Sequence, residues 1–150
     1  MTTSKSLQIG NIRVDRILEM EGPFMGPPEA FLGATLADVE AHRHWLEPHA
    51  LCAQGGKLIL AIQSHLIRTS RHTILIDTCV GCDKSNEWFA PWHMRTDTSW
   101  LGRLAAAGGS PPDIDFVFCT HLHGDHCGWN TRLVDGHWVP TFPNTKYILA

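Results

Sequence analysis

Alternation of apolar and polar residues predicts strands in several parts of the chain. Residues 9–19 alternate loosely, as a half-exposed strand does. Residues 57–69 carry apolar side chains on both alternating faces, which is typical of a central strand, and the turn at Ser70-Arg71 predicts a β-hairpin with residues 72–78. Residues 114–119 are apolar and rich in β-branched and aromatic side chains, which favours a buried strand. We therefore expect a sheet that contains these strands.

Two segments have the spacing and the end signals of helices. Thr35 and Asp38 form a capping-box pattern, and apolar residues at near-helical spacing predict a short amphipathic helix that ends near Pro48. Residues 98–107 predict a second helix, capped by Thr or Ser and stopped by Gly108-Gly109. Helices and strands together indicate a mixed α/β (α+β) fold.

Glycine and proline mark the loops. Residues 21–28 are rich in both and predict a loop that covers a pocket. Asp135-Gly136 predicts a hairpin turn between residues 132–134 and 137–139. A further strand is expected to begin at Lys146.

The buried strand at residues 114–119 leads directly into a cluster of side chains that bind metals. Residues 120–130 read Thr-His-Leu-His-Gly-Asp-His-Cys-Gly-Trp-Asn, with three imidazoles and one carboxylate inside six residues. His121 and His123 are two apart in an extended segment, so both nitrogens can converge on one ion at about 2.0–2.1 Å. After the turn that Gly124 permits, the next two residues can face a second ion. The candidate metal ligands are His121, His123, Asp125 and His126, and Asp125 is also the candidate catalytic residue.

Nitrogen and oxygen ligands together suit zinc, with manganese, iron or cobalt as substitutes. Two such ions about 3.5–4 Å apart can hold a hydroxide at neutral pH and polarise the group under attack, which is hydrolysis chemistry. The alternative is a chance cluster in a polar loop. That alternative is disfavoured, because burying so many titratable groups beside a core strand without compensation would be costly.

Other polar candidates carry weaker signals. Asp77 directly follows three aliphatic residues, 74–76, that are expected to be buried in the strand. It either accepts hydrogen bonds in a turn or orients a ligating histidine. Cys79 and Cys82 have the spacing of a redox or zinc pair, but without a second pair they read as buried thiols. His42 and His44 point to different sides of a helix and so read as a solvated face.

Residues 83–97 are irregular and aromatic, with Trp88, Phe89 and Trp92 among them. Large apolar residues in such a loop either pack it onto the core or line a binding cleft. We favour the cleft.

Composition narrows the classes of partner. Of the 150 residues, 43% are apolar and 18% charged, which is ordinary globular usage and predicts one domain. The net charge is −3 and Lys and Arg are not clustered, so neither nucleic acid nor a membrane is an expected partner. Five scattered cysteines indicate reduced thiols, and no apolar run has the length of a secretory signal or a spanning helix. We therefore expect a cytoplasmic protein. Its expected partner is a small-molecule substrate.

The His-X-His-X-Asp-His run, preceded by Ile-Leu-Ile-Asp-Thr at residues 74–78, resembles the metallo-β-lactamase superfamily of hydrolases. Residues 120–130 with Trp138-Val139-Pro140 look like its branch of lactonases and organophosphate hydrolases. The resemblance implies a four-layer αββα sandwich and a binuclear zinc site. It assigns His121 and His123 to the first metal, Asp125 and His126 to the second, and to Asp77 the support of the ligands.

The family's site also takes a third histidine, a bridging aspartate and a last histidine from later in the chain, and none of them can be placed in these 150 residues. We therefore expect residues 1–150 to be a single, truncated domain, the first half of the sandwich, with an exposed apolar sheet face and a sheet edge through which it self-associates. The function predicted is hydrolysis of a lactone, ester-like or phosphotriester bond by a metal-activated hydroxide. The alternative is a non-catalytic metal- or partner-binding fragment.

Overall fold

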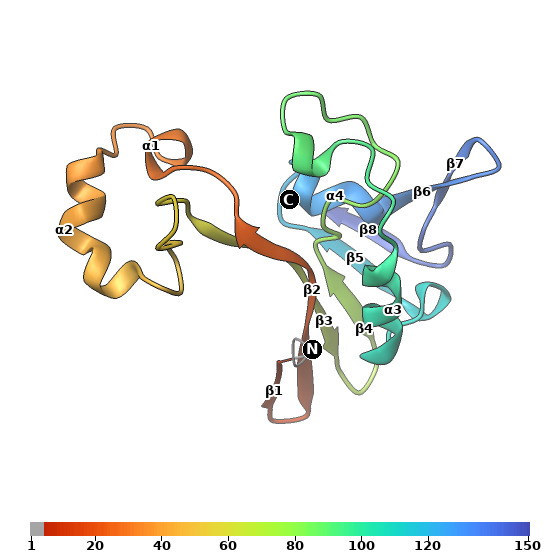
Figure 1. Ribbon diagram of the computed structural model, residues 1–150. Coiled ribbons are helices and arrows are strands. Elements are labelled where there is room, and N and C mark those ends of the chain that lie inside the picture. The colour runs from red at the N-terminus through yellow and green to blue at the C-terminus, as the bar shows by residue number, and fades with distance from the viewer. Residues whose placement is uncertain (1–4) are drawn as a thin grey trace. The chain divides into compact units, whose positions relative to one another are not determined.

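A mixed six-stranded sheet organises the part of the chain that the computed structural model describes, residues 5–150 (Figure 1). Its strand order is β1-β2-β3-β4-β5-β8, and β6 and β7 form a separate two-stranded sheet. The strands are β1 (Ser6–Ile9), β2 (Ile12–Pro23), β3 (Ile59–Arg68), β4 (Thr73–Ile76), β5 (Phe116–Cys119), β6 (Thr131–Val134), β7 (His137–Pro140) and β8 (Lys146–Leu149). Residues 1–4, part of the N-terminal stretch in which no secretory signal is expected, lie outside the described residues.

The chain packs as two compact units. The first comprises Met1–Glu19 and Ile62–Ala150, and the second comprises Met20–Ala61. These are units of packing within one chain, and the prediction of one domain for residues 1–150 stays a prediction. The site described below lies wholly in the first unit.

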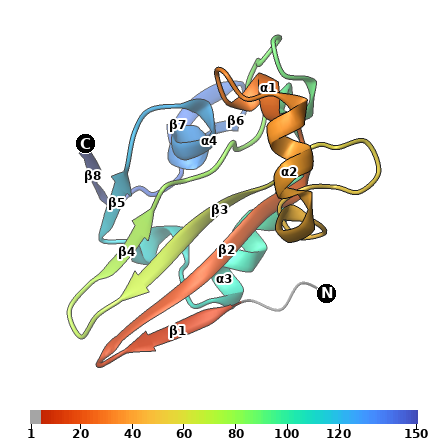
Figure 2. The same ribbon diagram turned by 90° about the vertical axis from the view of Figure 1, so that its left-hand side faces the viewer.

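The first unit contains both antiparallel and parallel pairs of strands. β3 and β4 form the predicted antiparallel hairpin, in which Leu66 faces Leu75. β5 then pairs with β4 in parallel, with Val117 beside Leu75, and β8 pairs with β5 in parallel. Because the carboxyl ends of parallel neighbours meet at one edge, the residues that follow β4 and β5 are brought side by side (Figure 2).

One face of this sheet is covered by α3 (Ser99–Ala106) (Figures 1 and 2). Leu66, Leu75 and Val117 share that face and are fully buried. Leu104 of α3 lies close to Leu66, since a side chain at Gly109 would contact both of them. The predicted helix is thus confirmed, and the positive φ of +88° at Gly108 ends it as expected.

The opposite face of the same strands is only partly buried. Alternation places on it the apolar residues Ile67, Ile74, Ile76, Phe116 and Phe118, and also the polar Gln63 and His65 of β3, and each of them retains some exposure. β8, at the end of the strand order among residues 5–150, carries exposed apolar residues along its length.

The second unit contains the first predicted helix. α2 (Leu36–Leu46) begins with the expected capping box, in which the Thr35 hydroxyl accepts from the Asp38 amide and the Asp38 carboxylate accepts from the Thr35 amide. Its buried face packs in a cluster with Leu51 and Leu58. His42 and His44 are exposed, in agreement with a solvated face.

Two local predictions meet different outcomes. Residues 21–28 are not all loop: β2 continues to Pro23, and α1 (Pro27–Ala30) follows with a proline at its start and the Glu29 carboxylate accepting from the Gly26 amide. The hairpin turn at Asp135-Gly136 is confirmed, with φ of 49° and 78° at these two residues. No helix among residues 5–150 is long and apolar enough to cross a membrane.

Candidate metal centre

Asp77 and Thr120 follow β4 and β5 and meet at the edge where these strands end. The Asp77 amide donates to the Phe118 carbonyl at 2.9 Å, which extends the ladder by one residue. The Asp77 carboxylate accepts from the Thr120 amide at 2.8 Å and from the Thr120 hydroxyl at 3.0 and 2.9 Å. Its backbone has a φ of 55°, a left-handed conformation that Asp tolerates better than most residues. The carboxylate is thereby fixed against the start of the histidine motif.

The same carboxylate contacts a motif histidine, because Asp77 Oδ2 lies 2.9 Å from His126 Nδ1. Of the two readings of Asp77, this geometry favours the one in which it orients a histidine. Carboxylate contact at Nδ1 leaves Nε2 as the nitrogen that faces away from Asp77. Whether that histidine binds metal stays a prediction.

The histidine motif turns through a short helix, α4 (Gly124–Cys127), whose N-cap is His123. The His126 amide donates to the His123 carbonyl at 3.0 Å, and the His126 carbonyl accepts from the Thr78 amide at 2.8 Å. His126 is therefore held by its backbone as well as by its ring. The next turn allows no side chain at Gly128, where a Cβ would come within 1.8 Å of the Val80 carbonyl oxygen.

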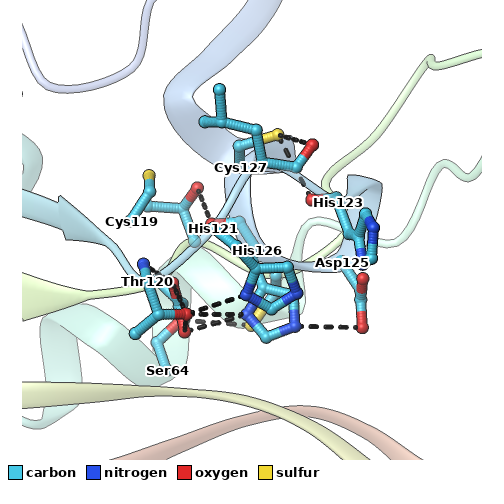
Figure 3. A network of polar contacts seen from close by, with 12 residues as sticks. Ser64, Cys119, Thr120, His121, His123, Asp125, His126 and Cys127 are labelled. Carbon is cyan, nitrogen blue, oxygen red and sulfur yellow. Dashed lines mark hydrogen bonds and ion pairs between the residues drawn. The ribbon is translucent and has the colours of Figure 1, made fainter. Parts of the chain in front are cut away.

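The four predicted ligands lie together at this strand edge (Figure 3). The ring centroids of His121 and His126 are 3.8 Å apart, and those of His121 and His123 are 4.7 Å apart. Asp125 Oδ2 lies 3.3 Å from His126 Nε2. The Thr120 hydroxyl is 3.1 Å from His121 Nδ1, so one residue contacts both Asp77 and a motif histidine.

The donor set fits zinc in its chemistry, because imidazole rings and a carboxylate lie close together and Asp77 contacts one imidazole at the nitrogen away from Asp125. It does not form a closed shell. Within residues 5–150, no three His, Cys, Asp or Glu side chains are arranged so that they could hold an ion together.

Sequence reasoning missed Glu19, which supports this region from the buried side. Its carboxylate, only 6% exposed, accepts from the Val80 and Gly81 amides at 2.9 and 3.1 Å and from Trp129 Nε1 at 2.7 Å. Burial raises the pKa of Glu19 above its usual value, and the three donors oppose that rise only in part. The signal was available, because alternation from the buried Ile17 puts residue 19 on the inward face.

Cys79 and Cys82 lack the exposure and the lowered pKa that redox or nucleophilic thiols need. Cys79 and Cys82 are free and buried. Burial raises the pKa of Cys79, and burial also raises that of Cys82 to about 11, so both thiols stay protonated at neutral pH. Cys79 Sγ lies 3.1 Å from the Ser64 hydroxyl, which is the environment of a buried structural thiol.

The aromatic loop both packs on itself and lines a pocket. Trp92, in the short helix η1 (Ala90–Trp92), is buried and packs edge-to-face on Trp88 and Phe89. Trp88 is 75% exposed. A pocket of about 350 Å³ lies beside them, and its lining residues are Trp88, Trp92, His123, Gly124 and Asp125. One wall of this pocket is therefore the histidine motif.

Comparison with known proteins agrees with this geometry. The model of the family described as "Metallo-beta-lactamase superfamily" matches residues 58–150, well over half of the chain. The chain belongs to the metallo-beta-lactamase superfamily. The matched residues contain both strand ends and the whole histidine motif. Family membership agrees with the resemblance inferred from the sequence.

Individual members of the superfamily are similar over most of this chain. The N-acyl homoserine lactonase AiiB of Agrobacterium fabrum (strain C58 / ATCC 33970) is 26% identical in an alignment 132 residues long, which covers 81% of this chain and 40% of that protein. The solved structure of AbOPH, a hydrolase of the beta-lactamase superfamily, is 26% identical with a TM-score of 0.67 and aligns with 96% of this chain and 43% of its own. The chain thus spans less than half the length of these relatives.

The lactonase AidC, a dizinc enzyme, shows the same fold at 19% identity and a TM-score of 0.69, over 96% of this chain and 43% of its own. A likeness at that identity shows the fold alone. With these neighbours, the predicted mixed α/β fold of the metallo-β-lactamase type is confirmed.

Proposed function

We propose that residues 1–150 are the amino-terminal part of a metal-dependent hydrolase that cleaves a lactone, ester-like or phosphotriester bond. The observation that carries this proposal is the grouping of four side chains of metal-binding types at the ends of two parallel strands, where Asp77 contacts one of them, His126. The name of the similar lactonase of Agrobacterium fabrum supports the choice of a lactone as the first substrate to test.

In this proposal His121 and His123 serve a first zinc ion, and Asp125 and His126 a second. A bound divalent zinc supplies a Lewis acid and a water that loses its proton near neutral pH; manganese, iron or cobalt would supply the same. Asp125 is also the proposed catalytic residue, because it lines the pocket that a substrate would enter.

Side chains of this chain have defined tasks in the proposed site. Asp77 holds the His126 ring through Nδ1 and leaves Nε2 facing Asp125. Thr120 donates to Asp77 and contacts His121 Nδ1, so it couples the orientation of two rings. Such outer contacts fix the tautomer and direction of metal-binding imidazoles.

We further propose that the functional domain is longer than residues 1–150. The apolar sheet face opposite α3 supports this, because side chains such as Phe116 and Phe118 are only partly buried there. The β8 edge also carries exposed apolar residues, including Ile148 and Leu149. A further layer that packs on this face and edge would bury both.

A fragment with that face open should self-associate. We expect analytical ultracentrifugation of residues 1–150 to show concentration-dependent association, and Ile148→Lys to weaken it. A monodisperse monomer with a cooperative thermal transition would contradict the proposal.

The proposed function is tested on the full-length protein by metal analysis and turnover together. We expect bound zinc and hydrolysis of at least one of a lactone, a β-lactam or a phosphotriester. His126→Ala should lower both the zinc content and the turnover, whereas His44→Ala, an exposed histidine on α2, should change neither. Full activity in the His126→Ala variant would overturn the assignment of the site.

A second candidate function is a metal- or partner-binding protein without catalysis. It rests on the same group of four side chains, which can bind a metal or a partner without the bridging ligand that hydrolysis needs. Zinc bound by the full-length protein without turnover of any of the three substrate classes would favour this candidate over the first.

A further inference from the structure

Two segments that carry parts of the candidate metal centre are joined through their backbones. Residues 77–81 follow β4, and residues 126–129 lie near the end of the histidine motif. Three hydrogen bonds join them: the Thr78 amide donates to the His126 carbonyl and the Trp129 amide to the Thr78 carbonyl, both at 2.8 Å, and the Gly128 amide donates to the Cys79 carbonyl at 2.7 Å. Asp77 opens the first segment and His126 the second, so this join places the Asp77 carboxylate beside the His126 ring.

The first segment has a backbone that suits an anion. A left-handed conformation recurs at every second residue, with φ of 55° at Asp77, 52° at Cys79, 76° at Gly81 and 62° at Asp83. Three of these four residues are not glycine, so the conformation costs free energy and persists only where the surrounding structure holds it. A backbone that changes hand from one residue to the next turns its amides to one side, where they can surround an anion.

The protein supplies that anion itself, as the carboxylate of Glu19 on β2. One oxygen accepts from the Val80 amide at 2.9 Å, and the other accepts from the Gly81 amide at 3.1 Å and from Trp129 Nε1 at 2.7 Å. Glu19 thus bonds both segments at once. Its own backbone is held as well, because Arg103 of α3 donates to the Glu19 carbonyl at 3.1 Å. With only 6% of its surface exposed, Glu19 leaves little room for water to replace these bonds.

The positions of these bonds connect Glu19 to the site. Val80 lies three residues after Asp77, and Trp129 lies three residues after His126. A shift at either anchor therefore moves one partner of the 2.9 Å contact between Asp77 Oδ2 and His126 Nδ1 relative to the other.

We propose that Glu19 is a positioning residue of the metal centre. By holding residues 77–81 against residues 126–129, it keeps the Asp77 carboxylate on the ring of His126. This inference rests on the proposed function, because it needs the metal centre. Glu19 acts through the two segments and not by contact with substrate or metal.

The first measurement is the zinc affinity of the full-length protein, by competition with a chromophoric chelator. Groups that orient metal-binding histidines contribute about 10–100-fold to affinity, and for Glu19→Ala we expect a loss of roughly tenfold, because Glu19 acts one step further out. The matched control is Leu104→Ala, which removes a fully buried side chain of α3 and also costs stability. It should leave zinc affinity unchanged. Equal losses in the two variants would show that Glu19 serves stability alone.

Two milder variants keep the test valid if Glu19→Ala does not fold. Glu19→Gln can still accept from the Gly81 amide and from Trp129 Nε1 with its one oxygen, so it should lose less zinc affinity than Glu19→Ala. Trp129→Phe keeps a ring to stack on Trp100 but removes the bond between Glu19 and the second segment, so it should lower zinc affinity as well. Unchanged affinity in both would overturn the inference.

A double-mutant cycle tests whether Glu19 acts through Asp77. Asp77→Asn weakens the hold on the His126 ring, and we expect Glu19→Ala to reduce zinc affinity much less in that background than alone. Losses that multiply would show that the two residues act independently, against the inference.

Hydrogen exchange of the metal-free protein gives a readout that needs no zinc. In Glu19→Ala the amides of Thr78, Gly128 and Trp129 should lose protection by a larger factor than the amides of the β3–β4 ladder. Leu104→Ala should not single out these three amides. A uniform loss of protection in Glu19→Ala would contradict the inference.

The outcomes distinguish this inference from the proposed function. A full-length protein that binds no zinc would reject both the metal centre and the role of Glu19 in it. Zinc affinity and turnover that persist unchanged in Glu19→Ala would sustain the hydrolase and reject the role of Glu19. Lower zinc affinity in Glu19→Ala but not in Leu104→Ala would sustain that role even in a protein without turnover.

Discussion

Val117 and Phe118 are neighbours on β5, yet they lie in different environments. Val117 is fully buried beneath α3, whereas Phe118 lies on the opposite face and stays partly exposed. The α3 face also carries a stacked pair of indoles, Trp100 and Trp129, with ring centroids 5.5 Å apart. One face of the sheet thus belongs to a fully buried core, whereas the other is an apolar surface that is only partly buried. Residues 5–150 therefore contain one complete contact between the sheet and a helix, and the proposed site lies at the strand ends of the same sheet.

The largest expected effect on stability comes from changes on the buried face that packs against α3. Trp100 is fully buried between Trp129 and Phe142, so Trp100→Ala should lower the free energy of unfolding by about 3–5 kcal/mol. Trp138→Ala, an exposed indole, should change it by no more than about 0.5 kcal/mol. Urea denaturation of the two variants measures both values, and similar losses would contradict the distinction between core and surface.

A polar link on the same face comes next. Glu19→Ala would leave three buried donors without an acceptor: the Val80 and Gly81 amides and Trp129 Nε1. We expect a loss of about 2–4 kcal/mol in the free energy of unfolding, since unpaired buried donors keep their desolvation cost. Glu87→Ala, at an exposed carboxylate, is the matched control and should have almost no effect.

The two neighbours on β5 compare the faces directly. Val117→Ala should cost about 1.5–3 kcal/mol in residues 1–150 and a similar amount in the full-length protein. Phe118→Ala should cost less than that in residues 1–150, where Phe118 is partly exposed, and about 3–5 kcal/mol in the full-length protein if a further layer covers it. Equal costs for Phe118→Ala in the two proteins would show that nothing covers this face.

The smallest expected effect is on pH dependence. Because burial raises the folded-state pKa of Glu19, the folded protein binds a proton there that the unfolded chain has released. The contribution of Glu19 to stability is therefore complete below about pH 4.5, its ordinary value, and is lost as pH rises through the raised pKa.

Glu19→Gln should remove that part of the pH dependence, whatever it does to the stability itself. Denaturation midpoints of the variant and the unmodified protein, measured between pH 4 and pH 7, give the two slopes. Parallel slopes would show that Glu19 does not titrate differently in the folded and unfolded states.

Most of the local structure could be predicted from the sequence, because it depends on short-range patterns of residues. The capping box at Thr35, the hairpin turn at Asp135-Gly136 and the end of α3 at Gly108 depend on residues a few positions apart. There were two exceptions. The strand expected at residues 9–19 is divided by a turn, since β1 ends at Ile9 and β2 begins at Ile12. The other exception is residues 21–28. There the Glu29 carboxylate satisfies the Gly26 amide and starts a helical turn, where the Gly and Pro content had predicted a loop.

The residues of the candidate site show the same difference between what local sequence reveals and what depends on distant residues. The sequence by itself singled out the histidines and Asp125 as metal-binding types, since they lie within six residues. For Asp77 it left two possible roles open. It did not identify Glu19, because the hydrogen-bond partners of that carboxylate are 61 or more residues away in the sequence.

Only the tertiary structure decided that Asp77 meets His126, 49 residues later in the chain. The physical reason is the parallel pairing of β4 and β5, which puts their carboxyl ends at one edge and their following residues within hydrogen-bonding distance. Which residues are of metal-binding types can be recognised from local spacing. Which of them are held in place, and by what, follows from strand pairing and from the burial that only the folded chain creates.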